Sequence, residues 1–281
     1  MKHLRAAARF AAVLGLMSAV TVAQVLVMVP LFRDKHTAAR LAAYLTNKFL
    51  NIDVVVKGKV NRQQQAINVA NHQSHLDAMV MTSIFNAASI GMREIASWPV
   101  IGPVVSKCFD TILIRRSKEH NSHAHYKLTQ ALNQGRNINV YPEGKCSDGS
   151  YMRQFKAGML RPLFGQAVDR DGKALVVNSD VVVQPVAIKV LRVNGQDAGD
   201  NQDLRDYYCW YDGHKNNHYL AHMWKNVMMA SNMKIEVTVL PALSPKDFDT
   251  PEALANQAHA MIHEVLYPGK PISVVSAPVQ A

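Results

Sequence analysis

Residues 66–77 read Ala-Ile-Asn-Val-Ala-Asn-His-Gln-Ser-His-Leu-Asp, an apolar strand that runs into a polar corner. Helical spacing of apolar residues follows over Leu76–Phe85. Serine is a favoured helix cap, so we expect Ser74 to cap this helix. Asp77 would then lie in the first turn, with His72 in the loop before it. The stretch predicts a strand-to-helix connection, which is a building unit of α/β domains.

The same alternation of apolar runs and helical spacing continues along the chain. Further strands are expected at Ile52–Val56, Thr111–Ile114, Asn137–Tyr141, Val181–Val190 and Ile235–Leu240, and further helices over His123–Leu132 and Ala253–Val265. This pattern predicts an α/β fold, a mixed β-sheet with flanking helices, in one domain over residues 51–270. Residues 194–217, rich in Asp, Asn, Gly and Tyr, are expected to leave the core and can lie over the site. Residues 271–281 lack periodicity and are expected to be a disordered tail.

Residues 1–50 are predicted to be a membrane anchor followed by an amphipathic helix. No charged side chain occurs from Phe10 to Phe32, so a helix there can cross a bilayer or lie within one leaflet. A cleaved signal peptide is the alternative, because basic residues precede the apolar run. Basic residues also follow it, so the positive-inside rule decides no orientation.

The segment from His36 to Leu50 has the periodicity of an amphipathic helix. One face is expected to carry Ala38, Leu41, Ala42, Leu45 and Phe49, with Arg40 and Asn47 opposite. This apolar face can pack on the core or lie in the membrane interface, and the sequence leaves both open.

Charge and cysteine content restrict the partners and the setting. A formal net charge of +10 draws the chain toward polyanions. A long apolar segment without zinc-finger or RNA-binding signatures favours an anionic membrane surface over nucleic acid. Cys108, Cys146 and Cys209 are widely spaced and odd in number, which indicates a reducing setting without a disulfide framework or structural zinc. Cys146 is interpreted as a small filler residue rather than a nucleophile.

His72 and Asp77 are the predicted catalytic pair. A chain that bends at the helix cap can bring the carboxylate onto the imidazole. The carboxylate then fixes the tautomer and raises the basicity of the free ring nitrogen, which can deprotonate a hydroxyl. Two alternatives stay open from the residues alone: a purely structural corner, and a metal site made of His72, His75 and Asp77.

Two further motifs lie where apolar strands end, which is where α/β domains usually bind ligands. The strand over residues 111–114 runs into two arginines, and Arg116 is predicted to bind phosphate through its guanidinium. The second motif is the turn Tyr141-Pro142-Glu143-Gly144-Lys145. There Gly144 can take a positive φ, and the carboxylate of Glu143 can accept a hydrogen bond from a substrate hydroxyl.

A fourth motif is the apolar stretch of residues 183–188, which is interrupted by Pro185. Proline lacks a backbone N–H, so a bulge or an open edge is expected there.

In this order the four motifs resemble those of the glycerolipid acyltransferase family, which includes bacterial lysophosphatidic acid acyltransferases. The corner matches the family's NHxSxxD pattern at every fixed position, and the turn matches FPEG with Tyr141 in place of Phe. Residues 98–102 and 155–158 are similar to the family's Pro-x-x-Gly and Phe-Lys-x-Gly stretches. The likeness extends from about residue 66 to about residue 190, the span of these motifs.

The resemblance implies a mechanism. His72, oriented by Asp77, would take the proton from a lysolipid hydroxyl as it attacks an acyl thioester of coenzyme A or acyl carrier protein. No covalent enzyme intermediate, cofactor or metal is implied. Substrate-binding residues would be Arg116 and Lys145 for the acceptor phosphate and Glu143 with Gly144 for the glycerol part, supported by Asn71, Ser74, Pro142 and Pro185.

The sequence departs from the family pattern in two places. Asp110 stands where Gly is usual, and Lys145-Cys146 replace Thr-Arg. The acceptor therefore stays open between lysophosphatidic acid, giving phosphatidic acid, and another lipid such as lyso-ornithine lipid. A catalytically silent lipid-binding protein and a metal-dependent hydrolase are rivals from other classes. The expected location is the cytoplasmic face of a bacterial inner membrane.

Overall fold

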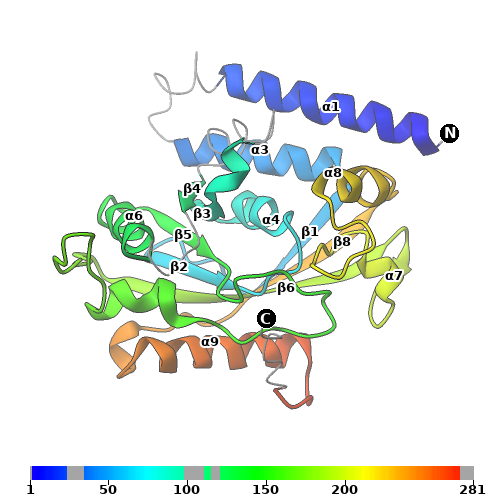
Figure 1. Cartoon of the computed structure of the whole chain (residues 1–281). Coiled ribbons are helices and arrows are strands. Elements are labelled where there is room, and N and C mark those ends of the chain that lie inside the picture. The colour runs from blue at the N-terminus through cyan, green and yellow to red at the C-terminus, as the bar shows by residue number, and fades with distance from the viewer. Residues whose placement is uncertain (1, 24–34, 98–110, 115–120, 273–281) are drawn as a thin grey trace.

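A mixed β-sheet forms the centre of the computed structural model, which describes residues 2–23, 35–97, 111–114 and 121–272 (Figure 1). The strands are β1 (Ile52–Lys57), β2 (Gln65–Ala70), β3 (Ala87–Met92), β4 (Ile112–Ile114), β5 (Asn137–Val140), β6 (Val181–Val193), β7 (Gln196–Asp197) and β8 (Met233–Val239). Their order across the sheet is β1-β8-β6-β2-β5-β3-β4, with β7 paired to β6. Strand β6 is antiparallel to β8 and β7, and the other neighbours are parallel. The prediction of a mixed sheet is confirmed.

The α-helices are α1 (Lys2–Ala23), α3 (Lys35–Phe49), α4 (Asp77–Ile84), α6 (Asn121–Asn133), α7 (Gln202–Arg205), α8 (Tyr219–His222) and α9 (Pro251–Leu266). Shorter helical turns are η2 (Arg93–Ser97), η5 (Ala157–Phe164), η6 (Met223–Val227) and η7 (Pro245–Asp247). Every strand and helix predicted for residues 51–270 is present with slightly shifted ends. Strand β3 was not predicted, because its Ala, Ser, Gly and Met residues have weak β-propensity; pairing with β5 and β4 places them in the sheet.

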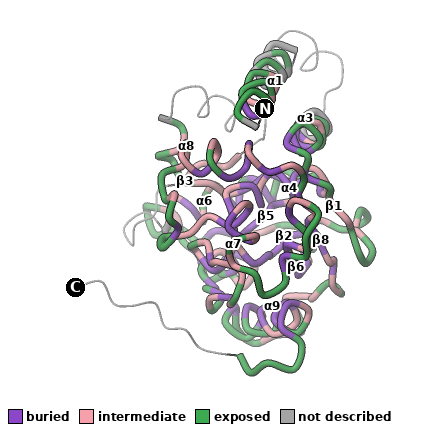
Figure 2. Tube along the Cα trace, turned by 90° about the vertical axis from the view of Figure 1, so that its right-hand side faces the viewer, coloured by how far each residue is buried: buried purple, intermediate pink, exposed green. Residues whose placement is uncertain are grey.

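Helices cover both faces of the sheet. Figure 1 shows α9 below the sheet and α3 and α4 above it. Strand β6 contributes to both cores in alternation: Ile188 and Val190 lie in the core that also contains Val80 of α4, while Val183 lies in the core that contains Leu254 of α9. Figure 2 shows that the sheet and the inner side of α9 are mainly buried.

The predicted apolar segment Phe10–Phe32 is helical over its described part, because α1 extends to Ala23. Residues 24–34 lie outside the described residues, as do residues 273–281 of the predicted tail. Helix α1 contacts the body of the protein through Arg9, which donates hydrogen bonds to the carbonyls of Ala230 and Ser231. Within the described part of the chain, no helix combines the length and apolar character required to span a bilayer.

The buried face of α3 differs from the predicted one. Asn47 is 2% exposed, whereas Leu41 and Phe49 are 50% and 42% exposed. Packing of the whole predicted face on the core, one of the two alternatives, is therefore wrong, although Ala42 of that face is buried. Small residues explain the difference: Ala39, Ala42 and Ala43 are buried and let the helix axis come close to its neighbours, so the large apolar side chains point outward.

Pro185 lies inside β6, where the ladder to the following segment is irregular. The last regular pair with β8 is Val186–Val239, and the next bridge is Val183–Leu243. Three residues on one segment therefore face two on the other, which is the expected bulge. The carbonyl of Pro185 still accepts a hydrogen bond from Leu240 N–H at 3.0 Å.

Candidate active site

The corner and the turn meet because their strands are parallel neighbours. Strands β2 and β5 pair with Val69 opposite Val140, so the loops that follow them leave from the same edge of the sheet. Asn71 fixes the exit from β2, since its Oδ1 accepts Ile188 N–H at 2.7 Å and its Nδ2 donates to Ile188 O at 2.9 Å. This side chain continues the pairing with β6 by one position, and His72 begins the loop.

The structure brings His72 and Asp77 together. His72 Nδ1 lies 2.8 Å from Asp77 Oδ2, which also accepts the backbone N–H groups of Gln73 at 2.7 Å and Ser74 at 2.9 Å. A carboxylate can only accept, so Nδ1 carries a proton, and in the neutral ring Nε2 is left as the acceptor. Asp77 is fully buried, while 17% of the His72 side chain is exposed. The imidazole can therefore be reached by a substrate.

Ser74 is not the helix cap. Helix α4 begins at Asp77, and its cap position is Leu76, which makes no side-chain cap bond. The Ser74 hydroxyl instead accepts Leu76 N–H at 3.2 Å. The reason is the Asp77 carboxylate, which itself takes the free backbone N–H groups of the corner and folds the loop back over the first turn. The predicted place of Asp77 in that turn is confirmed.

Two groups beside His72 influence its protonation. Burial alone works against the charged imidazolium, but the interactions of the ring with the Cys146 side chain and with the hydrogen-bonded Asp77 carboxylate outweigh it and raise the pKa of His72 above its ordinary value. Burial raises the pKa of the Cys146 thiol, against the opposing influence of His72. The ring of Tyr141 stacks on the imidazole with centroids 4.4 Å apart, so it covers one face of the base.

Glu143 ties the turn to the corner. Its Oε1 accepts His72 N–H at 2.6 Å, and its Oε2 accepts Arg153 N–H at 2.8 Å. The residue is 2% exposed, and burial raises its pKa to about 8, although both backbone donors act in the opposite direction. Gly144 has the expected positive φ, +76°, and the carbonyl of Pro142 accepts Lys156 N–H at 3.0 Å. Contact of Glu143 with the acceptor stays a prediction, because both oxygens serve backbone donors here.

The predicted phosphate-binding residues are only partly placed. Arg115 and Arg116 lie outside the described residues, as does Asp110. Lys145 is exposed, and its Nζ lies 2.9 Å from Asp212 Oδ2. Its part in binding an acceptor stays a prediction.

His75 does not join His72. Its ring contacts Trp210, Tyr219 and His222, with centroids 5.4, 4.7 and 5.2 Å away, and burial holds its pKa well below the ordinary value. Among the residues that the structure describes, no group of three His, Cys, Asp or Glu side chains is spaced to hold a metal ion.

Tyr208 is a site residue that the sequence did not reveal. It belongs to residues 194–217, the predicted excursion from the core, which lies against the corner. The Tyr208 hydroxyl donates to Asp77 Oδ1 at 2.7 Å, and Trp210 N–H donates to Gln73 O at 2.8 Å. The only available signal was composition, because residues 207–210 read Tyr-Tyr-Cys-Trp within an otherwise polar stretch. Such a cluster indicates burial.

Comparisons with known proteins agree with this site. A family model described as Acyltransferase matches residues 51–189. The 1-acyl-sn-glycerol-3-phosphate acyltransferase of Neisseria gonorrhoeae is 32% identical over 108 residues, which are 38% of this chain and 41% of that protein. The lyso-ornithine lipid O-acyltransferase of Pseudomonas aeruginosa is 29% identical over 160 residues, 57% of this chain and 54% of that protein. The matches thus span only about two fifths to one half of these relatives.

A solved structure shows the same fold. The 1-acyl-sn-glycerophosphate acyltransferase PlsC of Thermotoga maritima aligns with a TM-score of 0.57, covering 95% of this chain and 96% of that chain at 18% identity. The resemblance drawn from the four motifs is confirmed by the family match, which includes the corner, the turn and most of β6. Residues 51–189 therefore form a domain of the Acyltransferase family.

Proposed function

We propose that this chain transfers a fatty acyl group from a thioester, carried by coenzyme A or acyl carrier protein, to the free hydroxyl of a lysolipid. His72 Nε2 would take the proton of the hydroxyl while its oxygen attacks the thioester carbonyl, and the thiol would leave. Asp77 would hold the tautomer and stabilise the imidazolium that forms.

One observation carries this proposal: His72 Nδ1 lies on the fully buried carboxylate of Asp77, and the ring remains partly exposed. A base built in this way can activate an acceptor hydroxyl directly, so the reaction requires no acyl-enzyme. The family match over the same residues supports the assignment.

Lysophosphatidic acid is the acceptor that we propose first, with phosphatidic acid as the product. The relative from N. gonorrhoeae carries that activity in its name. Lys145 and Arg116 would bind the phosphate, and Glu143, through the loop that it fixes, would shape the place of the glycerol part.

A lyso-ornithine lipid is the second candidate. The turn carries Lys145-Cys146 in place of the family's Thr-Arg, and Lys145 is paired with Asp212. Both features weaken a phosphate site. The named activity of the P. aeruginosa relative supports this alternative.

We place the reaction at a membrane, on the cytoplasmic face of a bacterial inner membrane. Acceptor and product are lipids, the curated relatives come from bacteria, and a net charge of +10 favours an anionic surface.

The test is an acceptor comparison. Membranes that contain the protein receive a radiolabelled acyl donor, as acyl-coenzyme A or acyl carrier protein thioester, with lysophosphatidic acid or lyso-ornithine lipid. Labelled phosphatidic acid would support lysophosphatidic acid as the acceptor. Labelled ornithine lipid without labelled phosphatidic acid would support lyso-ornithine lipid instead. Membranes with an Asp77→Asn variant serve as the control, and no labelled lipid from any combination would contradict acyl transfer.

A further inference from the structure

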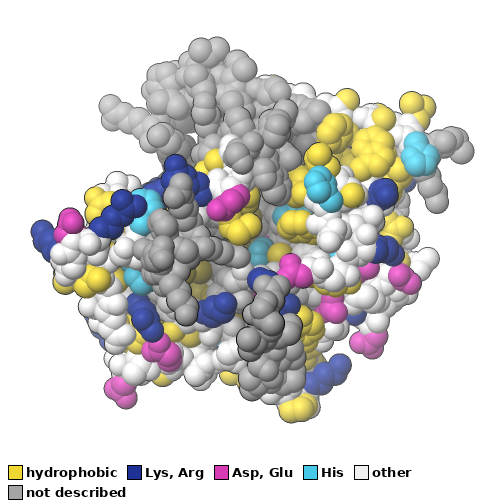
Figure 3. Space-filling view, viewed as in Figure 1, with side chains coloured by type: hydrophobic (Ala, Val, Ile, Leu, Met, Phe, Trp, Pro, Cys, Tyr) yellow, Lys and Arg dark blue, Asp and Glu magenta, His cyan; other side chains and the backbone are white. Residues whose placement is uncertain are grey.

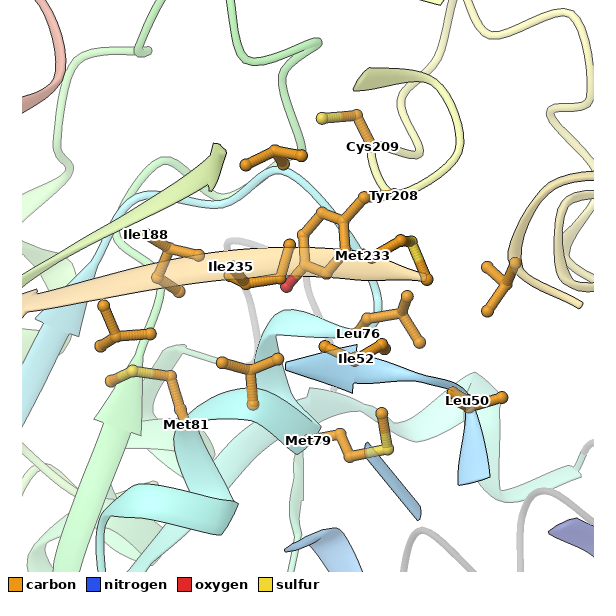
Figure 4. Packing of buried hydrophobic residues seen from close by; sticks show 14 of the residues in the cluster. Leu50, Ile52, Leu76, Met79, Met81, Ile188, Tyr208, Cys209, Met233 and Ile235 are labelled. Atoms are coloured by element: carbon orange, nitrogen blue, oxygen red, sulfur yellow. The ribbon is translucent and has the colours of Figure 1, made fainter. Parts of the chain in front are cut away.

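Asp77 has a second side-chain partner besides His72. Its Oδ1 accepts a hydrogen bond from the Tyr208 hydroxyl at 2.7 Å, while Oδ2 serves His72 and two backbone N–H groups. Asp77 and Tyr208 are both fully buried. Figure 4 shows the Tyr208 ring within the apolar cluster that contains Ile235 and Met233. Each oxygen of the Asp77 carboxylate is therefore held by a hydrogen bond, Oδ2 to His72 and Oδ1 to Tyr208.

The residues that follow Tyr208 are bound to the same corner. Trp210 N–H donates to the carbonyl of Gln73 at 2.8 Å, and Cys209 Sγ lies 3.9 Å from Gln73 Oε1. A Cβ built at Gly149 would approach Arg205, Cys209 and Gln73 at 3.3 to 3.4 Å. Segment 205–210 thus packs closely between the corner and the loop after the turn.

Arg205 anchors the beginning of this segment. The residue is 8% exposed, and its guanidinium donates to Asp148 O at 3.3 Å, to Gln202 Oε1 at 2.6 Å and to the carbonyl of Gly199. These partners come from the loop after the turn and from the excursion itself. A buried arginine with this many acceptors fixes the backbone from which Tyr208 extends.

The carbonyl of Asp206 provides a second anchor. His214 Nε2 lies 3.1 Å from it, His222 Nε2 lies 3.2 Å from it, and Asn226 Nδ2 donates to it at 2.8 Å. All three side chains are buried and come from the chain that follows the segment. The tyrosine is therefore preorganised by contacts that do not involve the substrate.

The hydroxyl of Tyr208 keeps its proton. Burial, and after it the charge of Asp77, raise the pKa of Tyr208 well above the ordinary value. A retained O–H can donate to a carboxylate at all working pH values. Such a donor spreads the negative charge of Asp77 and so reduces its pull on the proton of His72.

We propose that Tyr208 is a positioning residue of the acyl transfer, which acts through Asp77 on the orientation and basicity of His72. Segment 205–210 is then part of the active site. The inference rests on the proposed function, in which His72 is the general base.

The test compares Tyr208→Phe with Tyr211→Phe. Tyr211 lies beside the same segment, and its hydroxyl donates to another carboxylate, Asp206 Oδ1, at 3.2 Å. Each variant loses one hydrogen bond to a carboxylate, but only Tyr208→Phe releases Asp77. We expect Tyr208→Phe to lower kcat about tenfold with little change in KM, because the lost bond is one to a charged group. The acid limb of its kcat/KM profile should move to higher pH by about one unit. In Tyr211→Phe the acid limb of the kcat/KM profile should stay at the wild-type pH.

A second readout does not depend on turnover. The pKa of His72 should rise in Tyr208→Phe. It is measured by NMR titration of protein with labelled histidine rings, in which a His72→Gln variant identifies the His72 signal. Incorporation of a fluorinated tyrosine at position 208, a stronger donor, should move it in the opposite direction. Unchanged His72 titration and an unchanged pH profile, with only a lower Tm, would overturn the inference. Shifted titration in a protein that transfers no acyl group would support the coupling and overturn the proposed function instead.

Discussion

At the scale of single residues, Asp77 binds one partner from its own connection, His72, and one from a distant part of the chain, Tyr208. His72 and Asp77 lie in the same short connection, so the sequence predicted their contact, although the Asp77 carboxylate and not a Ser74 cap folds the corner. Tyr208 lies 131 residues from Asp77, and no local pattern reports that contact. The acceptance of a substrate hydroxyl by Glu143 stays a prediction, and the structure adds what the sequence did not reveal, namely that each of its oxygens accepts a backbone N–H.

The pH dependence of activity follows from the surroundings of His72. The base must be neutral to accept a proton, and its pKa is raised above 6.5 by its interactions with the Cys146 side chain and the Asp77 carboxylate, although burial opposes this. Activity should therefore fall as pH decreases through the raised pKa. We expect kcat/KM to increase with pH and to reach its half-maximal value above pH 6.5. A half-maximal value below this pH would contradict the described environment of the imidazole.

Cys146 offers a test of direct attack without an acyl-enzyme. Its thiol lies beside His72, and burial raises the pKa of this thiol, which disfavours the thiolate form needed for nucleophilic attack. Cys146→Ser should therefore keep its activity within about threefold of wild type, since no covalent step depends on the thiol. Loss of activity together with labelled acyl group retained on wild-type protein would show that the thiol is acylated.

At the scale of elements, periodicity predicted most of the fold, and the errors share a physical origin. Strand β3 has a single β-branched side chain, Ile90, among Ala, Ser, Gly and Met, so pairing with its neighbours in the sheet stabilises it as a strand. In α3 the larger apolar side chains do not mark the face that packs on the core, because close helix packing buries the alanines instead. Tertiary packing decided both cases, and a single sequence does not report it.

The turn that follows β5 depends on the backbone conformation of Gly144. Its φ of +76° is unfavourable for residues with a side chain, and a Cβ would approach Lys156 Nζ at 3.4 Å. We expect Gly144→Ala to lower the free energy of unfolding by roughly 1–2 kcal/mol, measured by urea denaturation. Gly158→Ala is the control, since a Cβ there has nothing within 4 Å. Equal stability of Gly144→Ala and wild type would contradict the described turn.

At the scale of the whole molecule, positive charge and exposed apolar side chains suit a protein that works on lipids. Figure 3 shows hydrophobic side chains gathered over the end of α1 and over α8. Leu4 of α1 is 76% exposed, and Leu220 of α8 is 54% exposed. On α3, Leu41 and Tyr44 are 50% and 49% exposed. We propose that this side of the molecule meets the membrane, which the sequence left open for α3.

Vesicle binding tests this surface. Leu41→Asp should weaken binding to vesicles that contain phosphatidylglycerol by about tenfold, the effect of losing one buried leucine side chain. Its Tm should stay near the wild-type value because the residue is exposed. Val176→Asp provides a matched control, since Val176 is 61% exposed and lies near the end of α6. Binding should also weaken as salt is raised, because charge attraction is screened. Equal binding of both variants would contradict the proposed surface.

The most direct measurement is the transfer of a radiolabelled acyl group to a lysolipid by wild-type protein and by a His72→Ala variant, with Cys146→Ser as a control for changes beside the same ring. The account predicts labelled product from wild type and from Cys146→Ser, and a loss of about a thousandfold or more in His72→Ala, the contribution typical of a positioned general base. Equal rates from wild type and His72→Ala would contradict the central role assigned to His72.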